Sequence, residues 1–142
     1  MKPEADLILG NSADQLMGLM PELGTSYSQG SAAILALLMK FAAREYERGA
    51  DIRSAENIDI RALFAELAPI VRDPQLRERV EAGAVTRDSS LAISVLNAAN
   101  HDLRCVLIEL QAHIEDIGAR DAERRIWCLL KTMAARRAVS LF

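Results

Sequence analysis

Residues 95–118, "VLNAANHDLRCVLIELQAHIEDIG", decide the fold class. On a helical wheel, seven apolar side chains of this stretch fall within roughly 60° of Leu103. They are Leu96, Ala99, Val106, Leu107, Leu110, Ile114 and Ile117. A stripe of this width predicts a long amphipathic helix that packs one face on the core. We expect it to be the longest helix, to begin near Asp88 or Ser89, and to end at Gly118.

The preceding half of the chain also has helical patterns. Ser12 stands in a capping-box position and predicts a helix start, and "TSYSQGS" at 25–31 indicates a turn-rich connector. The apolar side chains of 31–48 surround the wheel, which predicts a helix buried on more than one side and ended by Gly49. The polar tail up to residue 57 is expected to be a solvated connector.

The remaining helices are shorter. Residues 60–71 have a clear amphipathic pattern. Asp73 suits an N-cap, Pro74 a first helical position, and Gly83 a C-terminal stop. A last helix is expected to begin near Asp121 and to carry its apolar residues on one face, namely Ala122, Ile126, Leu129, Leu130 and Met133.

Composition supports the same fold class. The chain has 142 residues, of which 51% are hydrophobic and only 4% aromatic, so the core must consist mostly of aliphatic side chains. No hairpin signal and no Gly-rich strand-to-helix turn occurs. We therefore predict an all-α protein with one domain over 1–142. It is expected to be a bundle of five or six helices, with a long C-terminal antiparallel hairpin.

Several classes of function fit the sequence poorly. The net charge of −3 argues against a strongly basic nucleic-acid binder, and the apolar run 32–43 is too short to span a bilayer. Cys105 and Cys128 lack metal-type spacing and suit a reducing compartment. We therefore expect a cytoplasmic protein that has no membrane association and no cofactor.

Two i, i+4 pairs on the long helix could each offer two metal ligands. His101 pairs with Cys105, and Glu109 pairs with His113. The two histidines lie about 120° apart on the wheel, too divergent to share one closed site. We expect no metal.

The back of the long helix has small and apolar residues where charged ones are usual. Ala98, Cys105, Ile108 and Ala112 share this face with His101. Such a stripe predicts a contact surface. Either another helix of the same chain covers it, or a partner or second copy docks there. Together with the all-round apolar helix, it leads us to expect a homodimer.

Residues 94–110 resemble the H-box helix of bacterial sensor histidine kinases. In "HDLRCVL", the matching positions are His101, Asp102, Leu103, Arg104 and Leu107. The resemblance implies a dimerising helical hairpin in which His101 accepts a phosphoryl group and Asp102 orients or deprotonates it. The chain departs from the family pattern at Cys105 and Val106, which stand where the family has a polar residue and a proline. It also lacks a Gly-rich nucleotide-binding domain, so it could at most relay phosphate from a receiver-type partner.

Three functions are therefore compatible with the sequence. The first is a non-catalytic interaction or regulatory protein, and the second is a stand-alone phosphotransfer module that uses His101 and Asp102. The third and weakest is nucleic-acid binding by the basic last helix. Its basic residues are Arg120, Arg124, Arg125, Lys131, Arg136 and Arg137.

Overall fold

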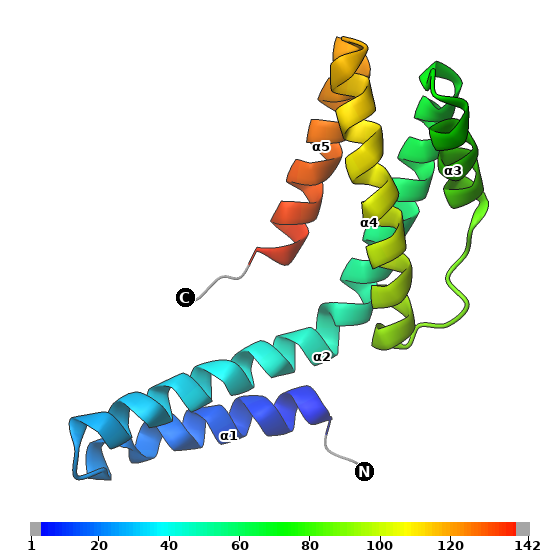
Figure 1. The fold of residues 1–142 in the computed structure, drawn as a ribbon. Helices are drawn as coiled ribbons and strands as arrows, with labels where there is room; N and C mark the ends of the chain where they lie inside the picture. The colour runs from blue at the N-terminus through cyan, green and yellow to red at the C-terminus, as the bar shows by residue number, and fades with distance from the viewer. Residues whose placement is uncertain (1–3, 139–142) are drawn as a thin grey trace. The chain divides into compact units, whose positions relative to one another are not determined.

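The computed structural model describes residues 4–138, and within this range it is all-helical with no strand (Figure 1). The α-helices are α1 (Ala5–Leu19), α2 (Ser26–Leu67), α3 (Pro74–Val85), α4 (Ile93–Asp116) and α5 (Arg120–Arg137). Two short 3₁₀ turns, η1 (Met20–Glu22) and η2 (Ala68–Ile70), follow α1 and α2. The predictions of an all-α fold and of five or six helices are confirmed, with five α-helices in the described residues.

The chain divides into two compact units, Met1–Ala50 and Asp51–Phe142, and the boundary falls within α2. Unit 1 contains α1 and the first part of α2. Unit 2 contains the rest of α2 with α3, α4 and α5. The expectation of a single domain over 1–142 stays a prediction.

In unit 1, α1 lies alongside the first part of α2, and Lys40 Nζ reaches Asp14 Oδ1 at 2.9 Å across the pair (Figure 1). The buried apolar side chains of this unit are small, namely Ala13, Ala32 and Ala36. Small side chains let two helix backbones approach closely. Alanines, rather than a core of large residues, therefore form the buried part of this helix pair.

Two expected boundaries in this unit are wrong. Ser12 lies inside α1, which begins at Ala5 because the apolar pattern already starts in its first turns. The expected connector at 25–31 is instead the start of α2. There the Ser28 backbone N–H donates to Thr25 Oγ1 at 3.1 Å, a bond that satisfies a donor of the first helical turn.

The expected connector up to residue 57 is also wrong, because α2 is continuous through it and is the longest helix, with 42 residues. No proline interrupts this stretch, and Gly49 is buried within the helix instead of ending it. A buried stripe with helical spacing runs through the region, and one of its members, Glu56, is polar. Its members are Ile52, Glu56, Ile60, Leu63 and Leu67.

Unit 2 has a core of large aliphatic side chains around Phe64, which is fully buried. All its helices contribute, α4 with Leu103, Leu107, Leu110 and Ile114, and α5 with Ala122, Ile126, Leu129 and Met133. The core faces predicted for the last two helices are thus confirmed. Gly83 of α3 lies directly against the Phe64 ring, where an added Cβ would come within 3.0 Å of Cδ2 and Cε2.

The ends of α3 and α4 follow from capping chemistry. Asp73 caps α3 as predicted, since its Oδ1 accepts from the N–H groups of Gln75 and Leu76 at 2.8 and 3.0 Å. Gly83 does not end α3, which continues to Val85. Gly118, with φ of 68°, ends α4 and turns the chain into α5. α4 begins at Ile93, later than expected, because Asp88 is held by Arg61 of α2.

Candidate functional site

A buried polar network ties the C-terminus of α5 to α2 and α4. The fully buried carboxylate of Glu56 accepts two hydrogen bonds from Arg137, from Nε at 2.7 Å and from Nη2 at 2.5 Å. Asn100 Nδ2 donates to Asn57 Oδ1 at 2.9 Å and to Glu56 Oε2 at 3.3 Å. A bidentate arginine–carboxylate pair with further donors is the arrangement that makes a buried charge tolerable.

A second polar cluster joins the α3–α4 connection to α2. Arg61 donates from Nη2 to Asp88 Oδ1 at 2.6 Å and from Nε to Thr86 Oγ1 at 2.9 Å. This side-chain hydrogen bond from Arg61 lowers the pKa of the Asp88 carboxyl below its ordinary value. Asn57 links the two clusters, because its Nδ2 also donates to Asp88 Oδ1 at 3.1 Å.

Sequence reasoning missed these buried polar residues. Glu56 and Asn57 were assigned to a solvated connector, and Asn100 was passed over between apolar neighbours. The available signal was their spacing, since Glu56 is four residues from both Ile52 and Ile60 on one helical face. Their partners, however, come from positions 44 and 81 residues away along the chain, as in the pairs with Asn100 and Arg137.

The back of α4 is open. His101, Ala98, Cys105, Ile108 and Ala112 are all exposed, and no other described helix of unit 2 covers this stripe. Ile108 retains 67% of its surface, which is unusual for an aliphatic side chain in the middle of a helix. Within the described part of unit 2, therefore, no helix of the same chain packs on the stripe.

His101 lines a hollow of about 460 Å³ on this face. The lining residues are Asn97, Asn100, His101, Arg104, Cys105, Ile108 and Arg137. The nearest polar contact of the imidazole is within its own helix, where Nε2 lies 3.8 Å from Cys105 Sγ. An exposed imidazole between two arginines has the chemistry to meet an anionic group.

Asp102 lies apart from this hollow. It lines a different one, of about 290 Å³, with Arg61, Gly83, Thr86 and Arg87 among its neighbours. Adjacent residues on a helix point about 100° apart, which explains the separation. No hydrogen bond joins Asp102 to His101 in the described structure, and the role that the H-box resemblance gives to Asp102 stays a prediction.

The other candidate ligands are dispersed. His113 Nε2 accepts from the Arg72 backbone N–H at 3.0 Å, and Glu109 forms a two-bond ion pair with Arg79 that lowers the pKa of Glu109. Cys105 and Cys128 are both exposed free thiols. Within residues 4–138, no group of three or more His, Cys, Asp and Glu side chains converges as a metal site would require.

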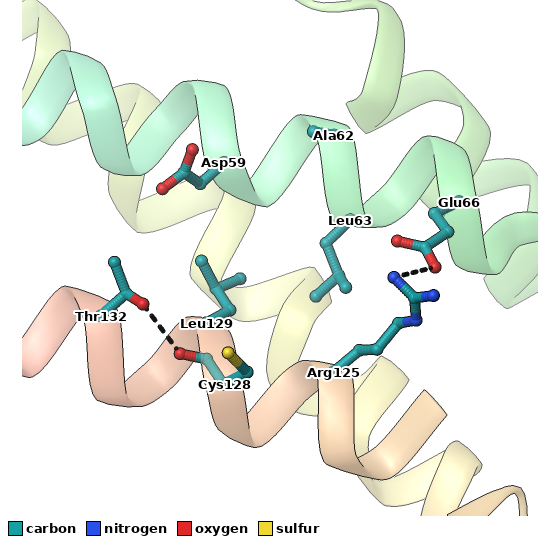
Figure 2. Close-up of a pocket in the computed structure, with 8 residues that line it drawn as sticks. All are labelled: Asp59, Ala62, Leu63, Glu66, Arg125, Cys128, Leu129 and Thr132. Carbon is teal, nitrogen blue, oxygen red and sulfur yellow. Dashed lines mark hydrogen bonds and ion pairs between the residues drawn. The ribbon is translucent and has the colours of Figure 1, made fainter. Parts of the chain in front are cut away.

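A shallow groove of about 310 Å³ lies between α2 and α5 (Figure 2). Arg125 reaches across it from α5 to Glu66 of α2 at 2.8 Å, and Thr132 Oγ1 donates to the Cys128 carbonyl at 3.0 Å. In addition, Arg124 pairs with Asp121 and Arg136 with Asp59, both at 2.6 Å. Much of the basic character of α5 is therefore neutralised by acidic side chains.

Comparison of the chain with protein-family models, with curated proteins and with solved structures finds no match. In the described part of the chain, none of the helices combines the length and the apolar character needed to cross a membrane.

Proposed function

We propose that this protein is a non-catalytic interaction protein that self-associates as a homodimer through unit 1. One observation carries the proposal, namely the row of exposed apolar side chains on α2 of that unit. Ile34 and Leu38 retain 61% and 55% of their surface. Tyr27, Leu35 and Leu37 are exposed as well, and Phe41 is half-buried.

The position of this row on the helix supports a docking role. On the wheel, Tyr27, Ile34, Leu38 and Phe41 lie within about 60° of one another, on the side opposite Ala32 and Ala36. α2 thus turns its small residues toward α1 and leaves its large ones open. An isolated helix pair with a core of alanines buries too little apolar surface to be stable.

A second copy of the chain is the occupant that best fits this row. From Tyr27 to Phe41 the row extends about 21 Å at 1.5 Å per residue, and apolar residues recur every seventh position along it. A continuous row of this kind is self-complementary about a twofold axis. Two helix pairs joined there would form a four-helix bundle with a shared apolar core.

Sedimentation of three matched variants tests the proposal. Ile34→Glu should convert the dimer to monomer at micromolar concentration, because two charges would be desolvated in an apolar seam. Ile58→Glu is the control, since Ile58 lies on the same helix with 59% of its surface exposed. Ile108→Glu examines the back of α4 and should leave the dimer intact. If the wild type is monomeric, or if only Ile108→Glu dissociates it, self-association through unit 1 is wrong.

The remaining parts of the proposal concern unit 2 and the compartment. We infer that unit 2 is a helical bundle whose α4–α5 hairpin presents the open stripe to a partner. We place the protein in the cytoplasm, which the exposed free thiols of Cys105 and Cys128 favour. Membrane association and nucleic-acid binding are not part of the proposal.

A second candidate function, histidine phosphotransfer, is favoured by the exposure of His101 beside Arg104 and Arg137. An imidazole nitrogen would attack phosphorus of an acyl phosphate on a receiver-type partner. The P–O bond to the partner's carboxylate would break, an N–P bond would form, and the imidazole would lose its N–H proton to solvent. Arginines near the phosphoryl oxygens would stabilise the charge during transfer.

Incubation with a phosphorylated receiver domain or acetyl phosphate tests this second function. An acid-labile label should appear on the wild type, disappear in His101→Gln and persist in His113→Gln, the matched histidine on the same helix. Label on both variants, or on neither the variants nor the wild type, would exclude His101 as the acceptor.

A further inference from the structure

We propose that the hollow around His101 is a non-covalent binding site for a phosphoryl dianion, in particular a phosphate monoester. This inference concerns binding alone and rests on the charge and geometry of the hollow. It deepens the second candidate function by naming a ligand class, and it does not require transfer of the phosphoryl group to His101.

The charge of the lining is the first argument. Arg104 and Arg137 line the hollow, and among residues 4–138 no acidic side chain does. Glu56, the acidic partner of Arg137, is 0% exposed, whereas the side chain of Arg137 retains 43% of its surface. The buried carboxylate therefore lies behind the guanidinium, and solvent meets the cationic side of the pair.

Part of the lining is also fixed before any ligand binds. Glu56 holds the Arg137 guanidinium through two hydrogen bonds, and Arg53 Nε donates to Asn97 Oδ1. A guanidinium held in this way loses little conformational entropy when it binds an oxyanion. Arg137, Asn97 and Asn100 thus form a rigid wall.

Arg104 differs from Arg137, because no other described side chain holds its guanidinium in place. Among residues 4–138 it has no hydrogen bond or ion pair, and it lies on the same helix as His101, three residues further along. Side chains at this spacing are neighbours on a helix surface. Arg104 and the imidazole, from α4, can therefore approach the same ligand oxygen atoms, while Arg137 lines the same hollow from α5.

The apolar part of the lining indicates that the anion has an organic substituent. Ile108 and Cys105 form that part, and the volume of about 460 Å³ lies within the range of roughly 300–1,000 Å³ typical of ligand pockets. This volume is larger than an inorganic anion requires. It suits a phosphorylated side chain of a partner or a small phosphate monoester, whose carbon atoms would cover Ile108.

The neighbouring hollows lack this combination of charge and shape. The hollow that contains Asp102 places a carboxylate beside Arg61 and Arg87, and Arg61 is already paired with Asp88. In the groove between α2 and α5, Glu66 pairs with Arg125 (Figure 2). An anion would meet acidic side chains at both places, so the His101 hollow is the preferred site.

The test is a titration of the full chain with phenyl phosphate and, separately, with inorganic phosphate at constant ionic strength. Binding is followed by calorimetry and by the NMR signals of the His101 ring. We expect saturable binding of phenyl phosphate that Arg104→Gln weakens by about tenfold, which corresponds to 1.4 kcal/mol. Arg124→Gln, an exposed arginine of α5 outside the hollow, is the matched control and should bind like the wild type. Arg137 is left unchanged, because its loss would leave the Glu56 carboxylate buried without its ion pair.

The results distinguish a phosphate monoester from inorganic phosphate as the ligand, and they distinguish anion binding from phosphotransfer. Tighter binding of phenyl phosphate supports a monoester, whereas equal binding of both probes supports the site and assigns it to phosphate itself. Saturable binding without covalent label supports the site while phosphotransfer fails. A linear, non-saturating response to both probes, or equal affinity in Arg104→Gln and the wild type, would overturn the proposal.

Discussion

The two units of this chain bury very different side chains, although one continuous helix contributes to both. Unit 1 buries Ala13, Ala32 and Ala36 and leaves most of its leucines and both of its isoleucines exposed. Unit 2 encloses Phe64 among large aliphatic residues and adds a satisfied polar network around Glu56. In the described residues, no buried side-chain nitrogen or oxygen lacks a hydrogen-bond partner.

The two units therefore offset the loss of conformational entropy on folding in different ways. Conformational entropy opposes the ordering of both, and only burial of sufficient apolar surface offsets it. Unit 2 has that surface within its own helices. Unit 1 has it only on its outer face, so we expect its stability to depend on a second copy.

The largest expected effect comes from removal of the central side chain of unit 2. Phe64→Ala should lower the free energy of unfolding by about 3–5 kcal/mol, because it removes a fully buried ring and leaves a cavity. Leu38→Ala in unit 1 should change that quantity by no more than about 0.5 kcal/mol where the protein is monomeric. Urea denaturation measures the free energy of unfolding of both variants. Similar losses in the two would contradict the proposed difference between the units.

The next effect concerns the buried ion pair. Arg137→Met should cost about 2–3 kcal/mol, because the Glu56 carboxylate would stay buried without its cation. The neighbouring change Arg136→Met is the control. Its partner Asp59 keeps 35% of its side-chain surface, so the loss should be about 1 kcal/mol or less. Equal losses in the two variants would show that the polar network contributes no more than a surface pair.

A smaller effect should distinguish the units by their dependence on protein concentration. Hydrogen exchange of α1 and of the first part of α2 should slow as concentration rises, because the dimer stabilises only the associated form. Mass action predicts about 1.4 kcal/mol of added protection for each tenfold excess over the dissociation constant. Exchange in α4 should not respond, and a parallel response in both units would contradict the assignment of the seam to unit 1.

The smallest effect is the response to acid. The carboxyls whose pKa is lowered, Asp73, Asp88 and Glu109, all belong to unit 2. For Asp88 the folded-state pKa lies below the ordinary value of 3.8, so its contribution to stability is present above that value and is lost as the pH falls below it, through the folded-state pKa. Urea denaturation between about pH 6 and about pH 3 should show this loss, with a shallower slope in Asp88→Asn. An unchanged slope in that variant would exclude Asp88 as a source.

Local patterns by themselves determined the fold class and much of the core. The wheel centred on Leu103 identified the buried face of α4, and the spacing of Ala122, Ile126, Leu129 and Met133 identified that of α5. Asp73 and Gly118 marked helix ends, because capping and positive φ depend on one or two neighbouring residues. The apolar back of α4 was also visible from the sequence, and its exposure around His101 agrees with the expectation that this side chain lies outside the core.

Only the tertiary structure decided the continuity of α2 and the composition of the candidate site. A polar segment such as 44–57 favours a connector by its composition, yet Glu56 is buried there because Arg137, 81 residues away, supplies the opposite charge. Arg137 joins His101 and Arg104 at one hollow for the same reason, whereas Asp102, adjacent to His101 in sequence, faces another. A charged side chain can be buried only where a group from elsewhere in the sequence pairs with it. Local periodicity holds no information on such pairs.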